Sequence, residues 1–343
     1  IKPATQNPRV INYMDEIITF VSTLVDKGFA YVSEGDVYFR VAKSNNYAKL
    51  ANKTLEDLEI GASGRTDAET ERKENPLDFA LWKAAKEGEV SWDSPWGPGR
   101  PGWHIECSVM ATEILGDTID IHGGGADLEF PHHTNEIAQS EAKTGKTFAN
   151  YWMHNGFVNV DNEKMSKSLG NFVTVHDMLQ TVDGQVLRFF LATQQYRKPI
   201  NFTEKAIHDA EVNLKYLKNT HSLPLTEQVN QAELQTYLDA FQEAMDDDFN
   251  TANGVTVLFD MAKWINSGNY DQTVKDAFEK MLQVFGIVFE EEVLDEDIEK
   301  LIEERQAARA NKDFATADRI RDELAAQGIK LLDTKEGVRW TRD

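Results

Sequence analysis

The chain has 343 residues, of which 41% are hydrophobic, and 58 acidic against 36 basic residues give a formal net charge of −22. This length allows two or three domains with their own cores, and the acidic balance argues against broad, nonspecific nucleic-acid binding. A single cysteine excludes an internal disulfide framework and fits a reducing compartment; no apolar run approaches the about 18 residues that span a bilayer, so we expect a cytoplasmic protein outside the membrane.

The first predicted elements are a helix and a hairpin. Apolar residues within 12–27 recur on one helical face, and Gly28 can end this helix in a left-handed conformation. Alternating residues from 37 to 41 predict a strand that pairs with residues 30–32. Residues 43–76 are polar and charged with few apolar anchors, so we expect an exposed insertion there.

The middle of the chain has the pattern of an α/β fold. A predicted helix over 105–115 precedes a short strand from Thr118 to His122, which we expect to be buried and to run into Gly123, Gly124 and Gly125. Glycines at the carboxyl end of a strand let a ligand approach the backbone. A tight structural turn explains these glycines equally well.

The rest of the chain is mainly helical. Further predicted elements are a helix over 131–143, a short helix or strand followed by a strand within 148–160, and an apolar helix over 185–195. A helical bundle then begins near residue 203, with helices to 221, to 246, over 251–264 and over 274–285. An acidic run at 290–297 is typical of a linker, and it precedes predicted helices over 298–311 and 316–327 and a strand pair at 329–332 and 337–341.

Three residues of the middle region have the chemistry of a zinc site. His132 and Glu136 are four residues apart on a predicted helix, so they project from the same face. Cys107 lies near the end of the adjoining apolar element, and zinc binds thiolate, imidazole and carboxylate. A buried free cysteine and an acidic residue in the first turn of a helix would give the same spacing. The fourth position would be filled by a substrate, by water or by a ligand outside this sequence.

Residues 164–168 read KMSKS and follow a predicted strand from Phe157 to Asp161. Lysines and serines on such a loop suit the negative charge that develops on a transferring phosphate. A solvated basic turn would have a similar composition, and only the specific string separates the two interpretations.

Several long motifs, in order along the chain, resemble cysteinyl-tRNA synthetases, which are class I aminoacyl-tRNA synthetases. They read GWHIECS, DIHGGGADL, FPHHTNEIAQS, NEKMSKSLGNF, DDDFNTANG, KDFATADRIRDEL and GVRW, and they cover essentially the whole chain. The resemblance implies an α/β fold that holds the second half of the Rossmann-like nucleotide-binding domain. An α-helical bundle and a small α+β C-terminal domain would follow it.

The resemblance also implies domain boundaries. The expected segments are 1–42 (remainder of the N-terminal catalytic fold and entry to the insertion), 43–99 (connective insertion), 100–160 (second half of the catalytic domain, with the zinc ligands), 161–202 (KMSKS loop and stem-contact region), 203–289 (helical anticodon-side bundle) and 290–343 (anticodon-recognition domain). The HIGH-type motif of this class and a further zinc cysteine are not in the sequence. We therefore expect the chain to start inside the family pattern, to hold half of the active site and to be inactive alone.

Residue roles follow from the same resemblance. Cys107, His132 and Glu136 would hold one zinc ion per chain, which takes the thiolate of the substrate. Trp103, His122 and Asp127 would line the pocket for cysteine and its adenylate. Gly123, Gly124, Met165, Ser166, Lys167 and Ser168 would bind ATP with Mg²⁺, with Lys164 and Lys167 as catalytic residues. The anticodon of tRNA-Cys would contact Arg309, Phe314, Asp318 and Asp333.

The resemblance implies a monomeric ligase that activates L-cysteine with ATP and transfers it to the 3′ end of tRNA-Cys. Two alternatives remain. One is a paralogue that joins cysteine to an amino sugar, which would need no anticodon domain. The other is a non-catalytic tRNA-binding fragment, which the missing HIGH motif favours.

Overall fold

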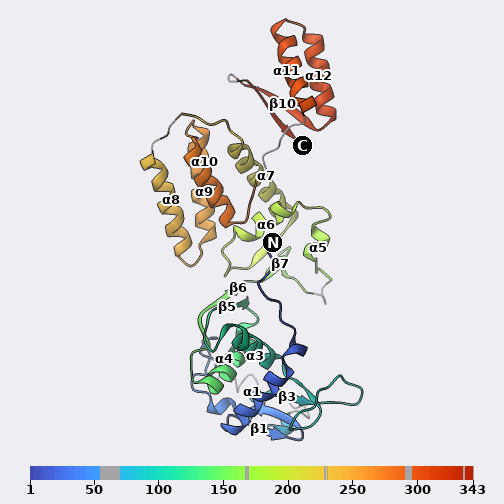
Figure 1. Cartoon of the computed structure of the whole chain (residues 1–343), viewed down its shortest axis with the longest axis vertical. Helices are drawn as coiled ribbons and strands as arrows, with labels where there is room; N and C mark the ends of the chain where they lie inside the picture. The colour runs from blue at the N-terminus through green and yellow to red at the C-terminus, as the bar shows by residue number, and fades with distance from the viewer. Residues whose placement is uncertain are drawn as a thin grey trace. The chain divides into compact units, whose positions relative to one another are not determined.

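The computed structural model describes residues 1–54, 70–166, 170–227, 229, 231–289, 296–334 and 337–342. The chain divides into two compact units, Ile1–Ile287 and Val288–Asp343 (Figure 1). The described residues leave out most of the predicted acidic linker and residues 55–69 of the predicted insertion. Among the described helices, none combines the length and the apolar character needed to cross a membrane.

The first unit begins with the predicted helix and hairpin. Helix α1 (Met14–Asp26) buries one apolar face, and Gly28 follows it with a φ of +76°. Strands β1 (Ala30–Ser33) and β2 (Asp36–Phe39) pair antiparallel and form the sheet β1-β2-β3-β4 with β3 (Phe79–Ala84) and β4 (Gly99–Pro101). All four side chains of β2 are buried, because β2 is an inner strand of this sheet.

Part of the predicted insertion is anchored in the core, contrary to the expectation of an exposed segment. Tyr47 is 9% exposed, and its hydroxyl donates a hydrogen bond to Oδ1 of Asn135 at 2.6 Å. The neighbouring Ala48 is buried as well. The far end of the same segment is attached as well, because Glu74 forms an ion pair of 2.7 Å with Arg40. The boundaries at 42/43 and 99/100 remain predictions, and the β1–β4 sheet extends across both.

Two packed helices and a parallel strand pair follow. Helix α3 (Trp103–Leu115) and helix α4 (Thr134–Thr144) pack on each other and on α1 (Figure 1). Strands β5 (Ile119–Gly125) and β6 (Ala149–Asn155) pair in parallel, with α4 between them in the chain. A turn of π-helix, Glu129–His133, precedes α4, so the helix starts later than the predicted Pro131.

The prediction of a buried strand that ends before the glycines is wrong. Strand β5 includes all three glycines, which pair with β6, and Ile121 in its centre is 56% exposed. Ile119 at the start of β5 is buried, but within the described part of the chain β5 has only β6 as a neighbouring strand.

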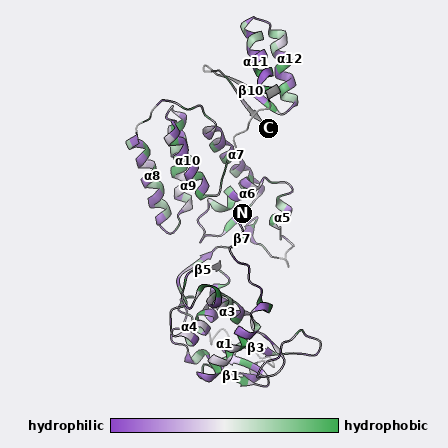
Figure 2. Cartoon of the chain, viewed as in Figure 1, coloured by the Kyte–Doolittle hydropathy of each residue, from purple (hydrophilic) through white to green (hydrophobic). Residues whose placement is uncertain are grey.

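The remainder of the first unit consists of a small sheet and the predicted helices. The sheet has the order β8-β7-β9 and contains β7 (Val158–Val160), β8 (Glu163–Lys164) and β9 (Ile200–Phe202). Between β8 and β9 the chain forms α5 (Val175–Met178) and α6 (Gly184–Ala192). The bundle consists of α7 (Glu204–His221), α8 (Gln231–Asp246), α9 (Thr251–Asn266) and α10 (Gln272–Val284). Hydrophilic and hydrophobic residues recur along these helices (Figure 2), as expected for helices that bury one face.

The second unit is a small α+β domain, as predicted. Helices α11 (Glu296–Ala310) and α12 (Phe314–Ala326) pack together, and β10 (Ile329–Thr334) pairs antiparallel with β11 (Gly337–Arg342). Its core is formed by buried aliphatic residues of both helices and of β10: Ile298, Ile302, Ile320, Leu324 and Ile329.

Candidate functional site

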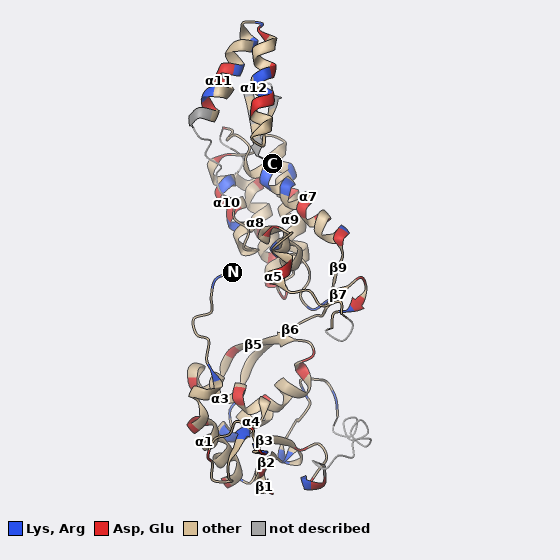
Figure 3. Cartoon of the chain, turned by 90° about the vertical axis from the view of Figure 1, so that its right-hand side faces the viewer, with Lys and Arg blue, Asp and Glu red and all other residues tan. Residues whose placement is uncertain are grey.

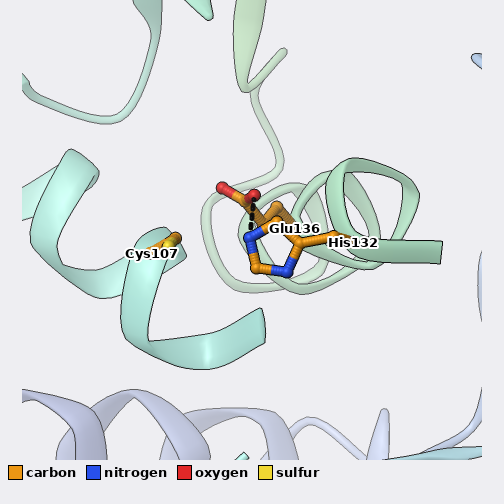
Figure 4. Close-up of side chains that lie close together, drawn as sticks. All are labelled: Cys107, His132 and Glu136. Carbon is orange, nitrogen blue, oxygen red and sulfur yellow. Dashed lines mark ion pairs between the residues drawn. The ribbon is translucent and has the colours of Figure 1, made fainter. Parts of the chain in front are cut away.

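The three predicted metal ligands lie together in the structure. Cys107 comes from α3, Glu136 from α4 and His132 from the turn before it (Figure 4). One ligand atom from each lies within 4.8 Å of the other two. Two buried residues connect the helices: Nε2 of Gln139 donates to Oγ of Ser108 at 2.8 Å. This contact fixes the register that places Cys107 opposite Glu136.

Glu136 is the most buried member of the cluster, with 0% of its surface exposed. Nε2 of His132 lies 3.0 Å from Oε1, and Nε2 of His122 lies 3.3 Å from Oε2. Apart from these ion pairs with histidines, the two buried carboxylate oxygens accept no hydrogen bond from the described residues. Burial acts to raise the pKa of Glu136, but the adjacent His122 and His132 lower it to about 2. A buried ionised carboxylate with unfilled oxygens suits a bound cation.

The thiol of Cys107, unlike the carboxyl group of Glu136, keeps its proton near pH 7. Burial, together with the nearby charges of Glu136 and Glu106, raises its pKa to about 12. A metal ion would have to displace this proton, because the thiolate is the form that binds metals. Sulfur, imidazole nitrogen and carboxylate oxygen are the donors that zinc accepts, so these three residues fit a zinc ion.

Further histidines surround this cluster, and the sequence analysis gave them no role. Nδ1 of His104 lies 2.8 Å from Nδ1 of His132, and Nδ1 of His133 lies 2.7 Å from Nε2 of His154. Burial lowers the pKa of His104 and of His133 to about 4, so both rings are neutral near pH 7. A sequence signal existed for His133, which precedes Glu136 by three residues and therefore shares its helical face.

His122, His133 and Glu136 form a second group of possible metal ligands, also within 4.8 Å of one another. The two groups share Glu136. The first group alone contains a sulfur ligand, which gives it the stronger preference for zinc over harder cations.

The predicted substrate residues lie at different distances from the cluster. Trp103 begins α3, is 58% exposed, and its ring centroid is 4.2 Å from that of His132. His122 touches Glu136 as described. Asp127 is exposed in the turn after β5, and the structure gives no contact that joins it to the cluster among the described residues.

Gly124 allows the strand β5 to approach the histidines closely. A Cβ atom at this position would lie 2.7 Å from the His133 ring, whereas one at Gly123 would meet nothing closer than 3.6 Å. Of these two positions, Gly124 is therefore the one where a close approach favours glycine.

The described part of the KMSKS segment has its own anchors. Nζ of Lys164 lies 4.0 Å from the centroid of the Phe157 ring. The backbone N–H of Ser166 donates to Oδ1 of Asn171 at 2.8 Å, and that of Met165 donates to the carbonyl of Val158 at 3.2 Å. Lys167 and Ser168 lie outside the described residues.

In the second unit, the predicted anticodon residues lie on or beside the two helices. Arg309 is exposed near the end of α11, and Phe314 is 62% exposed at the start of α12. Asp318 forms an ion pair of 3.0 Å with Arg321. Asp333 is in β10, opposite Val338, and its side chain is outside the described part. Both helices carry basic and acidic residues along their length (Figure 3).

Comparisons with known proteins were made for the whole chain. Family models match in three regions: tRNA synthetases class I (C) catalytic domain over residues 1–212, DALR domain over 240–290, and cysteinyl-tRNA ligase anticodon binding domain over 291–340. A cysteine–tRNA ligase of Streptococcus thermophilus (strain CNRZ 1066) is 95% identical over all 343 residues, and one of Streptococcus agalactiae serotype III (strain NEM316) is 82% identical. The chain spans 77% of the length of each.

Solved structures give a fold likeness at low identity. A Mycobacterium tuberculosis methionyl-tRNA synthetase in complex with methionyl-adenylate has a TM-score of 0.55 at 14% identity, covering 82% of this chain and 72% of that one. Its free form has a TM-score of 0.51 at 12% identity, covering 83% and 72%. These matches show the fold alone, which is that of a class I synthetase.

Proposed function

The chain belongs to the cysteinyl-tRNA ligase family of class I aminoacyl-tRNA synthetases, and from this premise we propose that it selects cysteine with zinc, activates it with ATP and transfers it to tRNA-Cys. The observation that carries the zinc part is the convergence of Cys107, His132 and Glu136 around a buried carboxylate without hydrogen bonds. Neither the amino-sugar paralogue nor the non-catalytic fragment is favoured by the matches, which carry the name of the ligase over the whole chain.

Selection of cysteine is assigned to the cluster and to Trp103. Zinc bound there would supply a Lewis acid that prefers a thiolate to a hydroxyl, which separates cysteine from serine without an editing step. Glu136 provides a fixed negative charge, and Trp103 offers an exposed aromatic face beside His132 that would close the pocket over the side chain of cysteine. His122 would line its other side, and we propose Asp127 for the amino group of the substrate.

Activation is assigned to the ends of β5 and to the KMSKS segment. The carboxylate oxygen of cysteine attacks the α-phosphorus of Mg²⁺-bound ATP, and pyrophosphate leaves. Gly123 and Gly124 would let the nucleotide approach the backbone, while Met165, Ser166 and Ser168 contact it. Lys164 and Lys167 would stabilise the charge that develops on the phosphates.

Transfer follows on the tRNA. A hydroxyl of the 3′-terminal ribose attacks the carbonyl carbon of cysteinyl adenylate, and AMP leaves. We propose that segments 161–202 and 203–289 support the tRNA stem and the anticodon side, and that 290–343 reads the anticodon. Phe314 would stack on a base, with Arg309, Asp318 and Asp333 as polar contacts. We also propose that the protein is a cytoplasmic monomer.

The direct test is a binding comparison of cysteine with serine. Isothermal titration of the zinc-loaded protein should give tight binding of cysteine and no measurable binding of serine. Cys107→Ala should abolish the difference, whereas Glu113→Gln, a change of an exposed carboxylate on the same helix, should preserve it. Equal binding of the two amino acids by the zinc-loaded wild type would overturn the proposal.

Charging provides the second test. The full-length ligase should attach cysteine to tRNA-Cys in an ATP-dependent reaction, and Lys164→Ala should slow cysteine-dependent pyrophosphate exchange. Unchanged exchange in this variant would remove the phosphate role of Lys164.

A further inference from the structure

His104 holds the ring of His132 from the side that faces away from Glu136. The two Nδ1 atoms lie 2.8 Å apart, while Nε2 of His132 lies 3.0 Å from Oε1 of Glu136. His132 therefore has one ring nitrogen directed at the candidate metal ligands and the other directed at His104.

The position of His104 is itself fixed by packing. Its ring meets Phe79 of β3 edge to face, with centroids 5.8 Å apart and an interplanar angle of 84°, and its centroid is 5.6 Å from that of Trp103. These contacts connect His104 to the β1–β4 sheet and hold Nδ1 toward His132.

The chemistry of the contact determines which nitrogen carries a proton. Two nitrogens at 2.8 Å form a hydrogen bond only if one is a donor and the other an acceptor. If the lone pair of Nε2 of His132 binds a cation, the proton of this neutral ring must be on Nδ1. That nitrogen then donates, and Nδ1 of His104 accepts.

We propose that His104 is a positioning residue that holds His132 in the Nδ1–H tautomer and directs its Nε2 at the metal. The inference rests on the proposed zinc site and adds a residue that does not touch the metal. Outer hydrogen-bond partners of ligating histidines have this effect in other metal sites, where their loss weakens metal binding.

Two variants separate the hydrogen bond from the packing. His104→Phe keeps a ring between Phe79 and Trp103 but has no acceptor, whereas His104→Asn places an acceptor oxygen near the position of Nδ1. His208→Phe changes an exposed histidine on α7, whose side chain is 70% exposed, and serves as the control. Zinc affinity is measured on the whole chain by competition with a chromophoric chelator.

We expect His104→Phe to weaken zinc binding about 10- to 100-fold, His104→Asn to recover most of the affinity, and His208→Phe to match the wild type. Wild-type affinity in His104→Phe, or equal losses in the Phe and Asn variants, would overturn the inference. If Cys107→Ala also binds zinc like the wild type, the proposed site itself fails, which distinguishes the two failures.

A second measurement does not depend on how the variants fold. In the zinc-loaded wild type, ¹⁵N chemical shifts of the His132 ring should show the proton on Nδ1. A proton on Nε2 would contradict the inference.

Discussion

Nε2 of His132 lies 3.0 Å from Oε1 of Glu136, one helical turn further along the chain. The carboxylate is completely buried and ionised, because the two imidazoles beside it lower its pKa to about 2 against the effect of burial. A carboxyl group whose pKa is lowered in the folded state adds stability near neutral pH, and a cation that binds only the folded state adds more. The pair therefore connects the stability of the chain to metal binding.

Glu136→Gln tests this connection. In metal-free protein near neutral pH the variant should unfold at a lower temperature than the wild type, because it loses the interactions with His122 and His132 that lower the pKa of Glu136. Zinc at about 100 times its Kd should stabilise the wild type by about 2.7 kcal/mol and the variant hardly at all. Thermal unfolding with EDTA and with zinc measures both effects. An unfolding temperature in EDTA equal to that of the wild type would show that the histidines do not stabilise the carboxylate, and equal stabilisation of both proteins by zinc would show that Glu136 does not bind the metal.

The glycines of β5 offer a matched pair. Gly124→Ala would bring a Cβ atom to 2.7 Å from the His133 ring, while the Cβ of Gly123→Ala would make only an ordinary contact of 3.6 Å with the carbonyl oxygen of Met153. We expect Gly124→Ala to lower zinc affinity and unfolding temperature by displacing His133 and the adjacent Glu136. Gly123→Ala should leave both within error of the wild type. Similar results for the two variants would mean that the close approach at Gly124 has no consequence.

Shortening a buried side chain of α3 should lower the free energy of unfolding. Ile105 is fully buried, two residues before Cys107, in the cluster that joins α1, α3 and the β1–β4 sheet. Ile105→Ala should cost about 2–5 kcal/mol of unfolding free energy. Val90→Ala, at a position 75% exposed, should cost no more than about 0.5 kcal/mol. Urea unfolding measures both, and equal costs would contradict the packing.

Three neighbouring residues, Tyr196, Arg197 and Asp248, make the stability of the chain depend on pH. Nε of Arg197 lies 2.6 Å from Oδ2 of Asp248, and the hydroxyl of Tyr196 donates to Oδ1 at 2.8 Å. The hydrogen bonds from Arg197 and then Tyr196 lower the pKa of Asp248. The stability from these contacts is therefore present above the ordinary carboxyl pKa and is lost as pH falls through the lowered value.

The stability of Asp248→Asn should accordingly depend less on pH in the acid range than that of the wild type. Its urea midpoint should fall less than that of the wild type between about pH 5 and about pH 3. Arg197→Gln should have the same effect, and the double variant should add nothing to it. Parallel profiles for all four proteins would show that the pair does not contribute.

Sequence periodicity predicted the regular elements well. The apolar faces of α1, α6 and the bundle helices, and the small C-terminal domain, were located within a few residues because each element buries a face of its own. It was less successful where burial depends on distant partners. Ile121 is exposed although we expected its strand to be buried, and Tyr47 is buried although its segment is polar.

The same distinction applies to the site. The spacing of His132 and Glu136 predicted their common face, because four residues make about one helical turn. Cys107 joins them only through the packing of α3 on α4, which spacing alone left open. His104 and His154 were missed because their partners, His132 and His133, lie in the turn before α4, which only the fold brings against α3 and β6.

X-ray absorption at the zinc edge tests the central claim most directly. The zinc-loaded chain should show one sulfur ligand at about 2.3 Å, which must be Cys107, the only cysteine of the sequence. Addition of cysteine should raise the count to two sulfurs, and addition of serine should leave it at one. A first shell of nitrogen and oxygen only, or a sulfur count that cysteine does not change, would contradict the account.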